Sequence, residues 1–441
     1  MIEYRNLRVA LLGAGSVGAQ VAALLLQHHG ELATRAGAGL ELVGVAVRDL
    51  DAARSADIPL ELLTTDAESL ILGADIVIEL MGGIEPARSY ILQALNSGAD
   101  VITGNKALLA THGPELFDAA EQVGAQLYYE AAVAGAIPII RPLRDSLAGD
   151  RIRRILGIVN GTTNFILDRM DTAGETLEVA LATATELGYA ERSDPSADIE
   201  GFDAAQKTAL LASLAFHTTV PLDKVYREGI TSITLEQVDA ARKAGYVVKL
   251  LSISERLTDA ETGEEGVSAR VYPALVPRDH PLAAVHGAKN AVFVEAEAAG
   301  DLMFYGAGAG GKETASAVLG DLVSAARRHV IGGPGVAEST HANLPILPIS
   351  RITTRYQITL SVIDQPGVLA AVALLFSAHR VSVEALEQSV RTVSQGDGLA
   401  TATLVIGTHK ASESDLSATV AALEASDVVS SVTSVLRVEG F

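Results

Sequence analysis

The sequence predicts an α/β fold of three successive units, and three observations support this prediction. Residues 1–140 alternate short apolar runs with helix-forming runs, which is typical of a doubly wound parallel sheet with right-handed crossovers. Residues 354–441 show the order βαββαβ, which predicts a ferredoxin-like module. Residues 331–353 are rich in glycine, proline and serine and are predicted to be a linker. The remaining residues, 141–304, mix both patterns and are predicted to form an α+β unit.

The first unit opens with a glycine-rich turn between a strand and a helix. Its strands are predicted at residues 9–12, 40–47, 76–80, 101–103 and 126–129. Directly after the first strand the sequence Gly13, Ala14, Gly15, Ser16, Val17, Gly18 forms a GxGxxG pattern, and a helix-forming run follows. In this pattern the first glycine permits a tight turn, the second lets backbone approach a pyrophosphate, and the third allows close packing of helix on strand. The N-terminus of the helix also attracts phosphate. These flanks favour a Rossmann-type dinucleotide site, with Gly13, Gly15, Ser16, Val17 and Gly18 as cofactor contacts, over a glycine turn in an ordinary α/β fold.

The end of the second strand bears on which dinucleotide binds. Arg48 and Asp49 follow it. An acid at this place chelates the ribose hydroxyls of NAD, whereas an arginine suits the 2′-phosphate of NADP. Because Arg48 comes first, the sequence favours NADP; NAD, with Arg48 as a solvated loop residue, is the alternative. Gly82, just beyond the third strand, is a further candidate cofactor contact. Residues 28–39, before the second strand, are predicted to be a polar, glycine-rich insert.

The composition excludes several classes of protein. The 441 residues are 49% hydrophobic, carry a net charge of −21 and contain no cysteine. Disulfides, thiolate metal sites and a cysteine nucleophile are therefore excluded. Nucleic-acid binding is not expected of so acidic a chain. The first residues lack the pattern of a signal peptide and no apolar run is long enough to cross a membrane, so a cytoplasmic protein is expected.

A second glycine-rich loop lies after the middle unit. Two strands, at 250–257 and 266–276, are predicted to form a hairpin around the polar residues 258–266. Residues 304–312 then contain Gly306 and Gly308, and a helical run follows at 314–328. We expect the chain to return here, at about 305–330, to complete the nucleotide domain, with the loop at the cofactor. The alternative is that these glycines serve a close helix–sheet contact.

One segment of the middle unit concentrates chemically useful groups. Residues 188–207 contain five carboxylates and Lys207, and an apolar helical run begins within them. Asp203 and Lys207 are four residues apart and so share a helix face. If this face points inward, Lys207 is a partly desolvated amine that can exchange a proton with a hydroxyl group. If it points outward, the pair is an ordinary surface salt bridge. Lys106 follows a parallel strand of the first unit, and ligands in open α/β sheets bind beyond the carboxyl ends of strands.

These motifs together resemble homoserine dehydrogenase of the longer bacterial type, with a C-terminal ACT domain. The resemblance covers the whole chain and is most specific in residues 188–207. It also rests on the segments 13–18, 104–106, 130–135, 161–164 and 306–310 and, for the ACT domain, on 364–369.

The resemblance implies the reversible NAD(P)-dependent interconversion of L-homoserine and L-aspartate 4-semialdehyde, a step toward threonine, methionine and isoleucine. It implies that Lys207 and Lys106 are the active-site lysines and that Asp203 orders the site. The implied substrate contacts are Glu191, Asp198, Gly161, Thr162 and Tyr189. A monovalent cation, expected to be sodium, is implied at Glu130 and at the carbonyl groups of Val133, Gly135 and Ile137. The ACT domain implies regulation by threonine, and pairing of such domains implies a homodimer or homotetramer.

Two other functions remain open at this point. A different amino-acid dehydrogenase on the same fold could oxidise an amine, although it would not need the carboxylates of residues 191–207 together with Lys106. A non-catalytic sensor could bind an amino acid and a nucleotide, although it would have no use for both lysines.

Overall fold

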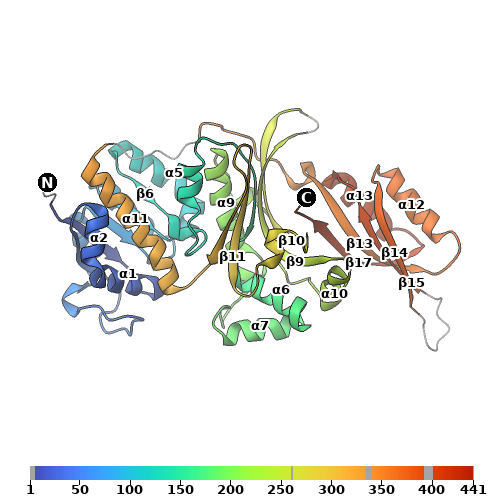
Figure 1. The fold of residues 1–441 in the computed structure, drawn as a ribbon, viewed down its shortest axis with the longest axis horizontal. Coiled ribbons are helices and arrows are strands. Elements are labelled where there is room, and N and C mark those ends of the chain that lie inside the picture. The colour runs from blue at the N-terminus through green and yellow to red at the C-terminus, as the bar shows by residue number, and fades with distance from the viewer. Residues whose placement is uncertain (1–4, 260–261, 334–339, 392–400, 441) are drawn as a thin grey trace.

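The computed structural model describes residues 5–259, 262–333, 340–391 and 401–440. Three units follow one another along the longest axis of the molecule (Figure 1). A nucleotide-binding unit lies at one end, a mixed sheet with its helices lies in the middle, and the C-terminal unit lies at the other end. No helix in these described ranges has the length and apolarity needed to cross a bilayer.

The first unit has the predicted Rossmann topology. Its sheet is parallel and has the strand order β3-β2-β1-β4-β5-β6. The strands are β1 (Leu7–Leu12), β2 (Leu40–Ala46), β3 (Leu63–Thr64), β4 (Ile76–Glu79), β5 (Asp100–Thr103) and β6 (Leu127–Tyr128). The connecting helices are α1 (Ser16–Gln27), α2 (His29–Ala36), α3 (Ala67–Leu72), α4 (Ala87–Asn96) and α5 (Lys106–Val123). The insert predicted at 28–39 is thus largely helical, because Leu32 and Ala36 give α2 a narrow buried face.

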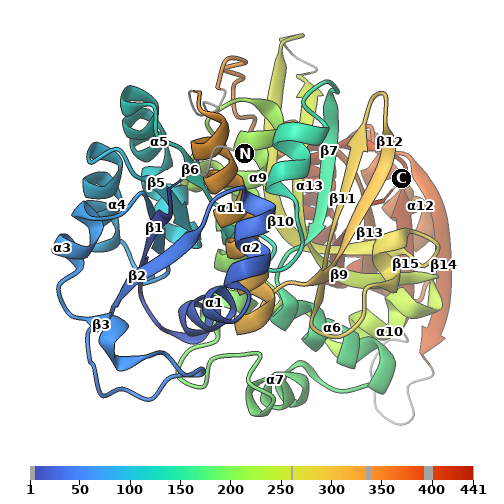
Figure 2. The same ribbon diagram turned by 60° about the vertical axis from the view of Figure 1, so that its left-hand side comes forward.

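A helix from much later in the chain completes this unit. α11 (Gly311–Ile331) packs against α1 and α2, and the three helices lie together on one face of the first sheet (Figure 2). Its residues Ala315, Val318 and Leu322 are buried in the same apolar cluster as Val21 and Leu25 of α1. The chain therefore returns to the nucleotide unit after passing through the middle unit.

The middle unit is a mixed sheet backed by helices. Its strands are β7 (Ile152–Ile158), β8 (Tyr226–Arg227), β9 (Tyr246–Thr258), β10 (Glu265–Pro277), β11 (Lys289–Ala296) and β12 (Gly300–Ala307). Its helices are α6 (Gly161–Ala173), α7 (Leu177–Glu186), α8 (Ser196–Ile199), α9 (Phe202–Phe216) and α10 (Leu235–Lys243). β9 and β10 form the predicted antiparallel hairpin, paired from Tyr246↔Pro277 to Thr258↔Glu265. α9 packs on this hairpin through a largely buried apolar face.

The C-terminal unit is ferredoxin-like, as predicted. It comprises β13 (Thr353–Ile363), α12 (Val368–Ala378), β14 (Val383–Arg391), β15 (Thr401–Thr408), β16 (Ala411–Ser412), α13 (Glu413–Glu424) and β17 (Val429–Val438). Its main strands have the order β17-β13-β15-β14.

The C-terminal unit is joined directly to the middle sheet, which the sequence did not predict. β17 pairs in parallel with β10 through Ala274↔Arg437 and Leu275↔Val438, so the two sheets are continuous. Part of the predicted linker is also packed. Ile346 forms a bridge with Val267, and Leu347 occupies the space that a side chain at residue 266 would need. The described part of the linker is therefore held against the hairpin.

Candidate active site

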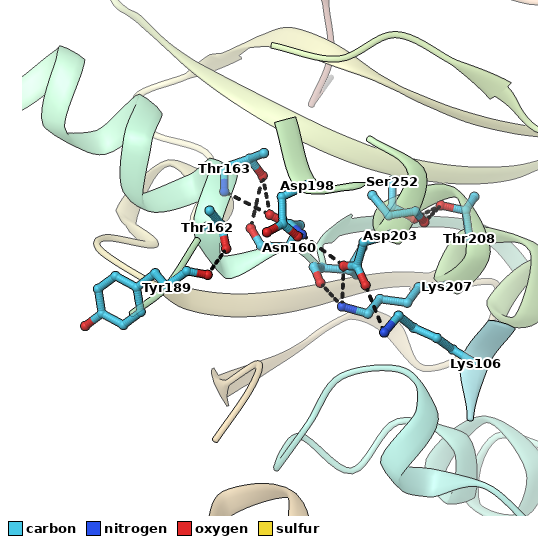
Figure 3. Close-up of polar contacts among 12 residues, drawn as sticks. Lys106, Asn160, Thr162, Thr163, Tyr189, Asp198, Asp203, Lys207, Thr208 and Ser252 are labelled. Carbon is cyan, nitrogen blue, oxygen red and sulfur yellow. Dashed lines mark hydrogen bonds and ion pairs between the residues drawn. The ribbon is translucent and has the colours of Figure 1, made fainter. Parts of the chain in front are cut away.

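Two lysines from different units meet at one aspartate. Lys106 is the first residue of α5, directly beyond β5, and Lys207 lies in the middle of α9. Lys207 Nζ lies 2.7 Å from Asp203 Oδ2, and Lys106 Nζ lies 3.2 Å from Asp203 Oδ1 (Figure 3). The face of α9 that bears Asp203 and Lys207 therefore points inward, and the alternative of a surface salt bridge is wrong.

The two ammonium groups differ in their surroundings. The side chain of Lys207 is only 10% exposed, and its Nζ also donates to the carbonyl oxygen of Val159 at 2.7 Å. The side chain of Lys106 is 37% exposed and contacts the other carboxylate oxygen of Asp203. Burial disfavours the charged form of Asp203, but attraction by Lys207 and Lys106 outweighs this effect and lowers the pKa of its carboxyl group to about 2. Asp203 is thus a fixed anion that holds two cations.

Asn160, which was not among the residues predicted from the sequence, binds both acids of the cluster. Its Nδ2 donates to Asp198 Oδ1 at 2.7 Å and to Asp203 Oδ2 at 2.9 Å. Its Oδ1 accepts from the backbone N–H of Thr163 and so caps α6. Burial and the charge of Asp203 raise the pKa of Asp198. The sequence signal was an asparagine directly before Gly161, which reads as a helix cap and gives no indication of the second role.

The other proposed substrate residues surround this cluster at different depths. Thr162 donates from its hydroxyl group to the carbonyl oxygen of Tyr189 at 2.8 Å. Gly161 lies tightly against the segment that precedes β11, because a Cβ there would stand 2.7 Å from the carbonyl oxygen of Ala288. The ring of Tyr189 is half-exposed, and Glu191 is exposed and makes no hydrogen bond or ion pair to the cluster within the described ranges. The structure therefore brings Thr162 and Gly161 close to the cluster and leaves Glu191 outside it.

The glycine-rich turn after β1 has the geometry that a dinucleotide needs. Gly13 has φ +98°, and a Cβ at Gly18 would stand 2.0 Å from the carbonyl oxygen of Gly13. The space around Gly15, by contrast, contains no described atom within 4 Å of a Cβ position. α1 begins directly after it without a side-chain cap, so its first N–H groups face this open space. Backbone donors at an open helix N-terminus fit the pyrophosphate of a dinucleotide.

The second glycine-rich loop meets the first. A Cβ at Gly311, where α11 begins, would stand 2.7 Å from the carbonyl oxygen of Ser16. The N-termini of α1 and α11 are therefore neighbours. Gly308 and Gly306 also have packing reasons to be glycine, because Gly308 lies against the side chain of Asn290 and Gly306 against Ile137. The loop thus sits at the cofactor edge and is packed tightly as well.

Arg48 lies exposed beyond the end of β2. The neighbouring Asp49 is occupied, since its Oδ1 accepts from the backbone N–H of Asp51 and its carbonyl oxygen accepts from Arg54. Arg48 makes no hydrogen bond within the described ranges. Its guanidinium group is therefore available to an anion, whereas one oxygen of the Asp49 carboxylate accepts a hydrogen bond within the loop.

The predicted cation loop follows β6. The carboxylate of Glu130 is buried and accepts hydrogen bonds from the backbone of Ile139, Ile140 and Arg141 and from the Arg141 guanidinium group. A carboxylate that accepts four N–H donors does not also serve a cation well. In the described chain no hydrogen bond reaches the carbonyl oxygens of Val133, Gly135 or Ile137. The main-chain oxygens of this loop are therefore open to a cation, whereas the Glu130 carboxylate already accepts N–H donors.

Comparison with known proteins agrees with this arrangement. Residues 13–130 match the family "Homoserine dehydrogenase, NAD binding domain", residues 138–323 match "Homoserine dehydrogenase", and residues 356–427 match the ACT domain. The homoserine dehydrogenase of Mycobacterium tuberculosis is 54% identical over 440 residues, which cover 99% of each chain.

Solved structures give the same result. A homoserine dehydrogenase from Thiobacillus denitrificans superposes with a TM-score of 0.91 and 38% identity over 99% of each chain. A hyperthermophilic archaeal homoserine dehydrogenase in complex with NADPH has a TM-score of 0.60 and 26% identity, and covers 75% of this chain and 99% of its own. The chain belongs to the homoserine dehydrogenase family, whose members are NAD(P)-dependent oxidoreductases that act on a CH–OH group.

Proposed function

We propose that the two-lysine cluster at Asp203 interconverts L-homoserine and L-aspartate 4-semialdehyde. The observation that carries this proposal is the position of the cluster. Lys106 comes from the carboxyl edge of the nucleotide sheet and Lys207 from the middle unit, and one buried carboxylate holds both. A substrate between the two units would meet the cofactor on one side and both ammonium groups on the other.

Lys207 is proposed as the acid and base of the reaction. A bound nicotinamide cofactor supplies or accepts the hydride at the reacting carbon. In the reducing direction Lys207 gives a proton from its ammonium group to the aldehyde oxygen as that oxygen gains charge. In the oxidising direction the neutral amine takes the hydroxyl proton. Partial desolvation favours this exchange, and Asp203 keeps the amine in place.

Lys106 and the acids are proposed to hold the amino-acid end of the substrate. Lys106 is the more exposed of the two lysines, which suits the pairing of its ammonium group with a substrate carboxylate. Glu191 and Asp198 are assigned to the substrate ammonium group, and Gly161, Thr162 and Tyr189 to the wall beside it. Glu191 must then turn inward when substrate binds.

The preferred cofactor is proposed to be NADPH, with Arg48 as the partner of its 2′-phosphate. The support is that Arg48 is exposed and makes no hydrogen bond in the described chain, while the Asp49 carboxylate is engaged. Replacement of Arg48 by alanine is expected to raise KM for NADPH by roughly tenfold and to leave KM for NADH unchanged. Equal changes for the two cofactors would overturn this assignment.

A monovalent cation, sodium, is proposed at the loop of Val133, Gly135 and Ile137, with main-chain oxygens as its ligands. The carbonyl oxygens of Val133, Gly135 and Ile137, which accept no hydrogen bond in the described residues, support it. Glu130 remains in the proposed set, although its carboxylate already accepts N–H donors. Turnover that is the same in sodium and in tetramethylammonium salts would contradict this proposal.

The ACT domain is proposed to bind threonine and to pair with a second copy in a homodimer or homotetramer. A cavity of about 150 Å³ supports a small effector; it lies at the turn between β13 and α12 and is lined by Asp364, Gly367, Gln388 and neighbouring residues. Slower turnover with threonine, together with sedimentation of the chain as a dimer or tetramer, is the expected result.

The activity itself is tested by the oxidation of NADPH in the presence of L-aspartate 4-semialdehyde and by the reverse reaction with L-homoserine. Turnover in both directions is expected. Turnover with an amine substrate alone would favour a different amino-acid dehydrogenase, and binding of nucleotide and amino acid without turnover would favour a sensor.

A further inference from the structure

A fully buried carboxylate, Glu79, lies at the cofactor edge of the first sheet and has no assigned role. It is the last residue of β4 and has no exposed surface. Its Oε1 accepts from the backbone N–H of Met81 at 2.7 Å and of Gly82 at 3.3 Å. Its Oε2 accepts from the hydroxyl group of Thr103 at 2.6 Å. One carboxylate therefore binds the turn after β4 and the end of β5 at the same time.

The bond to Thr103 continues to the helix that carries Lys106. Thr103 Oγ1 accepts from the backbone N–H of Asn105 at 3.0 Å. The side chain of Asn105 donates to the carbonyl oxygen of Gly83 at 2.6 Å and accepts from Leu108 as the cap of α5. Lys106 follows directly. A closed set of hydrogen bonds thus joins the turn after β4 to the start of α5.

The turn after β4 cannot fix its own shape. Gly82 and Gly83 both have φ near +73°. Glycine adopts this conformation readily, but its backbone adopts other conformations as readily, so the two glycines do not hold the turn in this shape. The residue before the turn is also closely packed. A Cβ at Gly13 would stand 2.7 Å from the carbonyl oxygen of Leu80, and one at Gly104 would stand 3.1 Å from the Leu80 side chain. A displacement of this turn would therefore also displace the loop after β1 and the loop before Lys106.

We propose that Glu79 is a positioning residue that sets the cofactor-binding edge and Lys106 in a fixed relation to each other. The inference rests on the proposed function, because only a hydride transfer between a cofactor at this edge and a substrate at Lys106 needs that relation. Glu79 touches neither ligand. Its carboxylate is required because it accepts from three donors at once, which an amide cannot do from both of its ends.

Replacement by glutamine retains the size of the side chain and removes one acceptor. If the amide oxygen faces the turn, the NH2 group faces the Thr103 hydroxyl group, which can then no longer donate to residue 79. If the amide is turned the other way, the NH2 group faces the two backbone N–H groups of the turn and cannot accept from them. We expect Glu79→Gln to weaken NADPH binding by roughly tenfold and to lower kcat by a similar factor, since one of the two links is lost and the other is no longer strengthened by charge.

The Thr103 variants separate positioning from general stability. Thr103→Val breaks the link to α5 and is expected to lower kcat by roughly tenfold, with a smaller effect on NADPH affinity. Thr103→Ser retains the hydroxyl group and is expected to behave as the wild type. This pair also keeps the inference testable if Glu79→Gln fails to fold.

The matched control is Asp100→Asn. Asp100 is an equally buried carboxylate of the same sheet, but it lies at the amino end of β5, where it binds Arg328, His329 and the backbone of Gln126. Its replacement is expected to lower Tm and to leave NADPH affinity and kcat unchanged at a temperature well below Tm.

The experiment measures NADPH affinity by the fluorescence of the bound cofactor, together with kcat, KM and Tm, for the full chain and these four variants. The inference is overturned if Glu79→Gln loses stability without loss of NADPH affinity and kcat, as Asp100→Asn is expected to do. It is also overturned if Thr103→Ser is as slow as Thr103→Val. A wild-type chain that binds NADPH but does not reduce L-aspartate 4-semialdehyde would instead refute the proposed function.

Discussion

Two networks of buried charge lie at the two boundaries between the units, and they are built differently. At the boundary with the nucleotide unit, Asp203 is shared by Lys106 and Lys207. At the boundary with the C-terminal unit, Arg437 donates to Glu413 and to Glu228, and its guanidinium group lies over the ring of Tyr272 at 4.5 Å. Each network combines charged side chains that are largely removed from water with one that is more exposed, Lys106 in the first and Glu228 in the second.

The two networks differ in the ratio of cations to carboxylates and in the exposure of the cation to solvent. The Asp203 cluster has two cations on one carboxylate, and one of them, Lys106, remains partly exposed. The Arg437 network matches one cation with two acids and surrounds it with aromatic rings. A cluster with a partly exposed cation that a ligand can reach is suited to bind and to move a proton, whereas a network whose cation is largely buried among acids and rings is suited to hold two sheets together.

The largest expected effect is at Lys207. Lys207→Met removes the proposed acid and base while Lys106 still neutralises Asp203, so we expect kcat to fall by roughly a thousandfold with the fold intact. The matched control is Lys249→Met, which removes another buried lysine from β9 outside the site. Steady-state oxidation of NADPH measures both. Equal losses in the two variants would remove the distinction between a catalytic and a structural buried charge.

The second effect is at Arg437. Arg437→Met leaves the Glu413 carboxylate buried without its cation, and we expect the free energy of unfolding to fall by about 3 kcal/mol. Denaturant unfolding measures this change, and kcat at low temperature should stay near the wild-type value. Arg35→Met is the control, because Arg35 and Glu31 form an exposed pair on α2 that is worth little. A large loss of kcat in Arg437→Met would show that this network is not only structural.

The third effect tests Asn160 as the neutral member of the Asp203 cluster. Asn160→Ala removes the donor that lies between Asp198 and Asp203. We expect kcat to fall by roughly 50-fold, because two charge-assisted hydrogen bonds are lost and the acids repel each other more strongly. Asn160→Ser, which can still cap α6, should recover stability but not kcat. Full recovery of kcat by serine would mean that Asn160 serves only as a helix cap.

The smallest effect concerns Lys249, a buried lysine for which the described residues show no ion pair. Lys249 Nζ donates to Asn164 Oδ1 and to the carbonyl oxygen of Val285, and burial lowers its pKa from 10.5 to about 8. Between these two values the unfolded chain holds a proton that the folded chain has lost, so the free energy of unfolding rises with pH. From pH 7.5 to 9.5 the gain attributable to Lys249 is about 2 kcal/mol. Lys249→Met should lack this gain, and an unchanged pH dependence would contradict the lowered pKa.

Part of the active site could be predicted because its signals are local. The spacing of Asp203 and Lys207 gives a shared helix face, and Lys106 follows a strand of a parallel sheet, where ligands bind. Asn160 could not be found in this way, because a cap before a helix has the same sequence signature whether or not its NH2 group binds distant acids. Glu79 likewise looks like the polar end of a strand, and its burial depends on Thr103 of the next strand.

The fold likewise has parts that could be predicted from the sequence and parts that could not. The alternation of strands and helices predicted the first sheet and the C-terminal module, since each depends on short-range patterns. The junction of β10 with β17 rests on two paired positions between strands far apart in sequence, and no local pattern encodes such a pairing. The ion pair of Arg437 with Glu228 across that junction follows from the pairing of the strands and could not be predicted either.

We infer that proton transfer at Lys207 and substrate binding at Lys106 depend on each other, because Asp203 holds both ammonium groups. The most direct test is a double-mutant cycle on kcat/KM for L-aspartate 4-semialdehyde with Lys106→Met, Lys207→Met and the double variant. If the lysines act together, the double variant should be only slightly slower than the slower single variant, because removal of either one disables the unit. Losses that multiply in the double variant would show that the two lysines act independently and would contradict the account.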